Sequence, residues 1–146
     1  MNILICDDIK AEIIEIEQMF KESGFDINIK SFTSGREALA YVQGEDVDVC
    51  FLDIIMPEIS GVTLAEKLRA SGYNGEIVFL TSSNEYAAES YKVKAFSYML
   101  KPIKPYDVRE VLNSLEKAKK KSDSDGIFIK ASKTARIRLF GARITP

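Results

Sequence analysis

Five short runs of apolar, β-prone residues alternate along the chain with segments whose apolar residues recur at helical spacing. The expected strands cover residues 2–6, 27–32, 47–52, 77–80 and 96–100. The first expected helix runs from the aspartates at positions 7 and 8 to about residues 23–24, and the others cover 34–43, 60–70, 84–92 and 105–121. Strands that are almost continuously apolar suit a parallel sheet with helices on both faces. The alternation therefore predicts a doubly wound α/β fold with a five-stranded parallel sheet.

Polar side chains follow four of the five expected strands. They are Asp7 and Asp8, Asp53, Thr81 and Lys101. In a doubly wound sheet, ligands bind beyond the carboxyl ends of the strands, so these side chains are expected to share one site. Clustered carboxylates repel one another unless they share protons or bind a cation, and carboxylate oxygens suit Mg²⁺, or Mn²⁺ in its place. Taken singly, Asp8 has a plainer interpretation as a helix N-cap and Asp53 as a loop carboxylate.

A carboxylate can attack a phosphoryl group when a metal ion screens the charge and aligns the reactants. Asp53 stands alone after the third of the five expected strands, which makes it the expected nucleophile. Asp8 is expected to coordinate the metal directly and Asp7 mainly through water. The backbone carbonyl of Ile55 is expected to supply a further ligand.

Lys101 and Thr81 complete the expected phosphoryl site. The Lys101 ammonium would pair with phosphoryl oxygens, and the Thr81 hydroxyl would donate a hydrogen bond to them. Each residue has a plainer alternative: Lys101 as a solvated surface lysine, and Thr81 as a strand-end hydroxyl that caps the following helix.

This set of residues resembles the receiver domain of bacterial two-component response regulators over about residues 1–120. The resemblance rests on the following positions: Asp7-Asp8, Asp53 with Met56-Pro57 and Gly61, Thr81-Ser82, Tyr98 and Lys101-Pro102.

The resemblance implies the flavodoxin-like receiver fold with strand order 2-1-3-4-5. It also implies that a sensor histidine kinase donates a phosphoryl group to Asp53, and that Thr81 and Tyr98 form a switch pair that changes the face of the fourth helix, fifth strand and fifth helix. Without the family, Tyr98 is simply a half-buried strand aromatic. A cis bond between Lys101 and Pro102 is implied as well, and dimerisation on phosphorylation is left open.

Within that family, residues 79–87 and 95–102 resemble receivers that precede a LytTR-type DNA-binding domain. We expect a receiver domain over 1–121, a linker over the small polar residues 122–126, and a tail over 127–146 that is similar to an incomplete start of a LytTR domain. Residues 116–146 hold 9 basic and 3 acidic side chains, against 11 and 19 in residues 1–115. A solvated helix end or the start of a nucleic-acid-binding region explains such a tail. DNA binding is expected only through a complete LytTR domain, and residues 141–146 match no known pattern.

Composition limits the remaining possibilities. The chain holds no histidine, which excludes a phosphohistidine relay within it, so the phosphoryl donor must be another molecule. Cys6 and Cys50 lie in apolar strand-like runs, which indicates buried, reduced thiols in a cytoplasmic protein. Residues 1–6 are too short and lack the basic leader of a signal peptide, and no later stretch could span a bilayer.

Two other classes of function deserve comparison. A Mg²⁺-dependent aspartyl-phosphate hydrolase also uses a strand-end aspartate, but it normally needs a second acid two residues later, where this chain has Ile55. A flavodoxin-like nucleotide or flavin binder would need a glycine-rich phosphate cradle, whereas the first loop carries Asp7 and Asp8. A phosphatase assay would separate the hydrolase from the switch.

Overall fold

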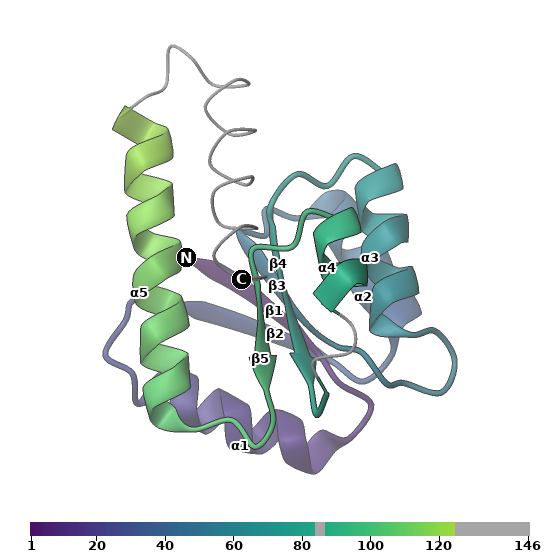
Figure 1. Cartoon of the computed structure of the whole chain (residues 1–146), viewed down its shortest axis with the longest axis horizontal. Coiled ribbons are helices and arrows are strands. Elements are labelled where there is room, and N and C mark those ends of the chain that lie inside the picture. Colours follow the sequence, from purple (N-terminus) through teal and green to yellow (C-terminus); the bar gives the residue numbers. More distant parts are fainter. Residues whose placement is uncertain (84–86, 125–146) are drawn as a thin grey trace.

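All five strands lie parallel in one sheet, in the order β2-β1-β3-β4-β5 (Figure 1). This architecture comes from a computed structural model that describes residues 1–83 and 87–124. The strands are β1 (Asn2–Cys6), β2 (Asn28–Phe32), β3 (Val49–Asp53), β4 (Glu76–Thr81) and β5 (Ser97–Leu100). The helices are α1 (Lys10–Lys21), α2 (Gly35–Gly44), α3 (Gly61–Ala70), α4 (Ala87–Lys92) and α5 (Pro105–Ser124). The predicted doubly wound fold and strand order are confirmed, and each strand begins and ends within two residues of its predicted bounds.

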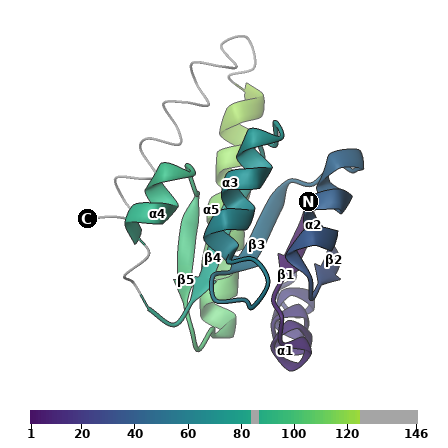
Figure 2. The same cartoon turned by 90° about the vertical axis from the view of Figure 1, so that its right-hand side faces the viewer.

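Alternate residues of the buried strands point to opposite faces of the sheet, so the chain has two apolar cores. On one face, α1 and α5 pack against strand residues such as Ile5 and Phe51. On the other face, α2, α3 and the segment after α4 pack against their sequence neighbours Cys6 and Leu52. Figure 2, turned by 90° from Figure 1, shows α3 in front of α5, with α4 to the left of both. This two-sided burial explains why β1, β3 and β4 are almost continuously apolar instead of alternating with polar residues.

Two of the helices begin at serine caps. The Ser34 and Ser60 side chains accept hydrogen bonds from the backbone N–H of Glu37 and Thr63, at 3.4 and 3.1 Å. Helix α1 instead begins at Lys10, with Ile9 in the N-cap position and no side-chain cap. The interpretation of Asp8 as an N-cap is therefore wrong.

Helix α5 continues to Ser124, three residues into the segment expected to be a linker. The helix expected over 105–121 is thus three residues longer than predicted, because Lys119–Lys121 are good helix formers and extending an existing helix costs little. The rest of that segment and the expected LytTR-like tail, 127–146, lie outside the described residues.

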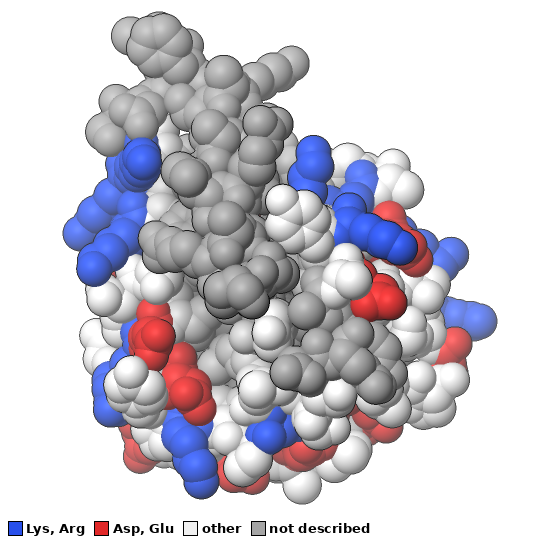
Figure 3. Space-filling view, in the orientation of Figure 1, with Lys and Arg blue, Asp and Glu red and all other residues white. Residues whose placement is uncertain are grey.

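Figure 3 shows basic side chains along the α5 edge, where Lys117, Lys119 and Lys120 are exposed. Within the described part of the chain, no helix has the length and apolarity needed to cross a membrane.

Arg69 on α3 joins two loops through backbone carbonyls. Its guanidinium donates to Tyr73 and Gly75 before β4, at 3.1 and 2.7 Å, and to Val93 and Lys94 after α4, at 2.8 and 3.1 Å. The planar fork of arginine suits such multiple donation. The carboxyl end of α4 is thereby tied to the loop between α3 and β4.

Gly61 fixes the loop that carries the end of β3. Its backbone N–H donates to the carbonyl of Ile54 at 2.8 Å. A Cβ added at Gly61 would fall on the carbonyl oxygen of Asp53 and lie 2.9 Å from the Ile54 Cα. Since both neighbours are backbone atoms, they cannot move aside cheaply, and only glycine fits here.

We predict that Gly61→Ala lowers the free energy of unfolding by about 1–3 kcal/mol, because the added methyl group overpacks rigid backbone. Urea-induced unfolding measures the change. Gly44→Ala at the end of α2 is the matched control, since its Cβ meets nothing within 4 Å; it should be neutral or slightly stabilising. Equal effects of the two substitutions would contradict the close-packing argument.

Candidate functional site

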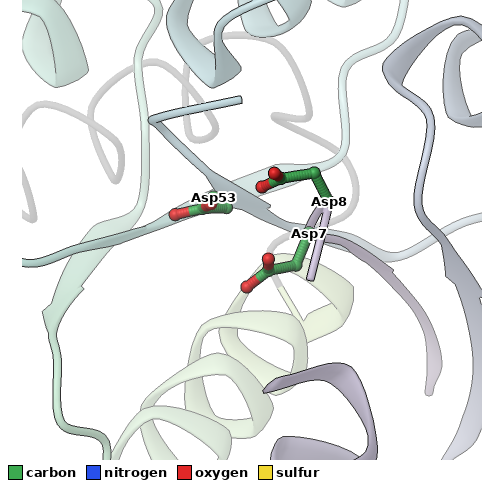
Figure 4. Close-up of side chains that lie close together, drawn as sticks. All are labelled: Asp7, Asp8 and Asp53. Carbon is green, nitrogen blue, oxygen red and sulfur yellow. The ribbon is translucent and has the colours of Figure 1, made fainter. Parts of the chain in front are cut away.

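Three aspartates gather at the carboxyl edge of the sheet (Figure 4). Asp7 and Asp8 directly follow β1, and Asp53 is the last residue of β3, the central strand. Strands β1 and β3 are parallel neighbours with Cys6 opposite Leu52, so their carboxyl ends lie side by side. One carboxylate oxygen from each aspartate lies within 4.8 Å of the others. Asp7 and Asp53 are only 2% and 4% exposed, so the predicted cluster exists and is largely shielded from water.

Lys101, one residue past β5, reaches across the end of β4 into this cluster. Its Nζ donates to Asp53 Oδ1 at 3.1 Å and to Asp7 Oδ2 at 3.4 Å. A third contact, at 3.1 Å, goes to Oε1 of Glu12 on α1. The interpretation of Lys101 as a surface lysine is wrong, since its ammonium is shared among carboxylates. The implied cis bond between Lys101 and Pro102 is also present.

Sequence reasoning missed Glu12. It lies in the first turn of α1, four residues after Asp8, where a helix that starts at the sheet edge returns a side chain toward that edge. An acidic residue at that position, next to a strand-end aspartate pair, is the signal that could have indicated it.

Burial and like charge disturb the ionisation of the site. Burial, together with the charges of Asp7 and Asp8, raises the pKa of Asp53 to about 6, although Lys101 opposes the shift. Burial also raises the pKa of Asp7, despite a 2.9 Å hydrogen bond from the Ile9 N–H and the nearby Lys101. Burial alone would lower the pKa of Lys101, but Asp53, Asp7 and Glu12 together raise it. The Lys101 ammonium therefore stays charged, but its single positive charge does not balance the negative charges of the clustered carboxylates.

The donor set fits a hard divalent cation. Asp8 Oδ1 is buried and has no hydrogen-bond partner among the described residues, which is the condition of an oxygen that is free to bind a metal ion. With Asp7 and Asp53 it offers an all-oxygen site of the kind that Mg²⁺ prefers. Ile55, whose carbonyl is the other expected ligand, lies in the loop after β3 and is 60% exposed.

The expected switch residues lie on neighbouring strands. Thr81 is the last residue of β4 and is buried; its hydroxyl accepts from the Ser83 N–H at 3.1 Å and donates to the Ser83 carbonyl at 3.0 Å. Thr81 pairs with Leu100, and Tyr98 pairs with Phe79, so Thr81 and Tyr98 share one face of the sheet. Tyr98 is half-buried against the core that contains Phe79.

The raised pKa of Asp53 predicts a specific pH dependence of stability in metal-free protein. A carboxyl whose pKa is higher in the folded state stabilises the fold below its unfolded pKa, and this contribution is lost as pH rises through about 6. The rise from 3.8 to about 6 corresponds to about 3 kcal/mol. Between pH 4 and pH 7, Asp53→Asn should therefore gain stability relative to wild type by about this amount.

Urea unfolding in the presence of a chelator, repeated across this pH range, measures the difference. Asp46→Asn, the same change at an exposed residue, serves as the control and should track wild type. A constant difference between Asp53→Asn and wild type would show that Asp53 ionises as it does in the unfolded chain.

Comparison with known proteins assigns most of the chain, including the three aspartates and Lys101, to one domain family. Residues 3–113 match the response regulator receiver domain family. The transcriptional regulatory protein YpdB of Escherichia coli (strain K12) is 32% identical over 118 residues, which cover 81% of this chain and 48% of YpdB. The chain spans about half the length of the curated relatives it matches.

Two solved structures have the same fold. The response regulatory domain of MrkE from Klebsiella pneumoniae matches with a TM-score of 0.74 and 31% identity, covering 81% of this chain and 97% of that domain. The response regulator protein TrrA from Thermotoga maritima, solved in complex with Mg(2+)-BeF, matches with a TM-score of 0.69 and 28% identity, covering 78% and 97%. The family match takes in all five strand ends and the residues gathered there, and this chain belongs to the response regulator receiver domain family.

Proposed function

We propose that this chain is a phosphoacceptor switch in which Asp53 receives a phosphoryl group from a sensor histidine kinase. The observation that carries the proposal is the 3.1 Å contact between Lys101 Nζ and Asp53 Oδ1, at the end of the central strand and beside Asp7 and Asp8. A carboxylate held next to a fixed ammonium is prepared for the charge that an arriving phosphoryl group brings.

In the proposed transfer, a carboxylate oxygen of Asp53 forms a bond to phosphorus as the phosphorus–nitrogen bond of the kinase phosphohistidine breaks. The imidazole nitrogen leaves with the bonding electron pair and takes up a proton. Lys101 then pairs with the phosphoryl oxygens in place of the Asp53 carboxylate. Because the chain has no histidine, the donor is a separate molecule.

The metal in this proposal is Mg²⁺, for which Mn²⁺ can substitute. Asp8 and Asp53 would hold it directly, Asp7 mainly through water, and the carbonyl of Ile55 would complete the protein ligands. When bound, the metal neutralises charge on the phosphoryl oxygens. The Asp8 Oδ1 atom, which is buried and has no hydrogen-bond partner in the described part of the chain, supports this assignment. Receiver domains of this family bind Mg²⁺ at an acidic pocket, and TrrA was solved with Mg(2+)-BeF.

The switch would involve Thr81 and Tyr98. On phosphorylation, the Thr81 hydroxyl would leave its contacts to Ser83 and donate to the phosphoryl group, and the Tyr98 ring would fill the space beside it. Their common face of the sheet supports this coupling. The resulting change would control transcriptional output, a role that the name of YpdB supports. Contact with DNA would require a complete LytTR domain, and a homodimer that forms on phosphorylation is a further proposed partner.

We predict that Asp8→Asn weakens Mg²⁺ binding by about tenfold or more, because one charged ligand is lost. The same change should stabilise the metal-free fold, since it relieves repulsion among the three carboxylates. Calorimetric titration with Mg²⁺ and urea unfolding measure the two effects, with Asp26→Asn at an exposed site as control. Unchanged Mg²⁺ affinity would remove Asp8 from the ligand set.

We predict that acetyl phosphate with Mg²⁺ adds one phosphoryl group to the wild-type chain, and that Asp53→Asn abolishes this labelling. An amide is a poor nucleophile, while its shape is close to that of the carboxyl group. Intact-mass spectrometry measures the labelling, and Asp48→Asn, at the residue that precedes β3, is the control. Full labelling of Asp53→Asn would overturn the assignment of the acceptor.

A further inference from the structure

The Lys101 ammonium is divided among carboxylates from three parts of the fold. Two of them, Asp7 and Asp53, belong to the three-aspartate cluster at the carboxyl edge of the sheet. The third, Glu12, comes from α1 and contacts Nζ at 3.1 Å, as closely as Asp53 does. An ammonium has three N–H donors, so these three contacts occupy all of them.

The Glu12 carboxylate forms its ion pair with Lys101 through one oxygen only. Its Oε1 accepts from Lys101, while its Oε2 is buried and has no hydrogen-bond partner within residues 1–83 and 87–124. The side chain as a whole is 37% exposed, so water is within reach of a different rotamer. In that other rotamer, water could satisfy both carboxylate oxygens. We therefore attribute the observed rotamer of Glu12 to its ion pair with Lys101.

Glu12 should act oppositely on the two ligands of the proposed site. Its negative charge attracts a divalent cation but repels an incoming phosphoryl group. It also holds one of the three Lys101 donors that a phosphoryl group would otherwise receive. Glu12 lies outside the set of carboxylates that are close enough to share the metal, so it can influence both ligands without binding either.

We propose that Glu12 is a positioning residue that retains Lys101 in the unphosphorylated site and thereby opposes the phosphorylated state. The inference rests on the proposed function and deepens it. Glu12 sets how readily the site passes from metal-bound to phosphoryl-bound, because its carboxylate competes with the phosphoryl group for the Lys101 ammonium.

The test uses the full chain with Glu12→Gln and two probes. Mg²⁺ affinity is measured by calorimetry, and the affinity for beryllofluoride, a phosphoryl mimic, is measured at saturating Mg²⁺. Glu12→Gln should weaken Mg²⁺ binding by about two- to fivefold and tighten beryllofluoride binding by about three- to tenfold. Glu12→Asp, which keeps the charge on a shorter side chain, should fall between wild type and Glu12→Gln.

Glu15→Gln is the matched control, because Glu15 is an exposed acid on the same helix; it should change both affinities less than twofold at about 0.1 M salt. Structural damage would weaken both ligands, so the opposite signs are the diagnostic result. Weaker beryllofluoride binding by Glu12→Gln, or a change no larger than that of Glu15→Gln, would overturn the inference. Failure of wild type to bind beryllofluoride would instead overturn the proposed function.

Discussion

Repulsion among carboxylates at one edge of the sheet is the constraint on which the organisation of this receiver domain depends. Asp7 and Asp53 are almost fully buried, where water cannot screen their charges, and Lys101 compensates them only in part. The rest of the fold supplies the rigidity that keeps these groups together. Two apolar cores, one on each face of the sheet, fix the strands whose ends carry the aspartates. A site strained in this way gains the most from a ligand that brings positive charge.

Sheet topology explains where this strain is concentrated. The strand order changes direction between β1 and β3, because the chain adds β2 on one side of β1 and β3 on the other. The loops after these two strands leave toward opposite faces and open a crevice at the carboxyl edge. Asp7, Asp8 and Asp53 are the residues that the chain places at this point. The long side chain of Lys101 is needed because β5 is separated from β3 by β4.

Much of the fold was predictable from local patterns, since an apolar strand or an amphipathic helix leaves its period in the sequence. The cluster of Asp7, Asp8 and Asp53 followed from the fold, because the carboxyl ends of parallel strands meet at one edge. The pairing of Glu12 with Lys101 was not predictable in this way. It joins residues 89 positions apart and depends on how α1 packs beside the loop after β5. The end of α5 was also missed, because helix propagation through 122–124 outweighed the small polar residues there.

The four carbonyls that Arg69 binds have a consequence for local unfolding. Opening the carboxyl end of α4 would separate the Arg69 guanidinium from the carbonyls of Val93 and Lys94. A partly buried, charged donor that loses its hydrogen-bond acceptors raises the free energy of the opened state. The free energy of fraying in α4 should therefore rise from its amino end toward Arg69. Helix α4 has six residues and is too short to be stable alone, so its carboxyl end is anchored by Arg69 on α3. Its two ends can therefore open on different timescales.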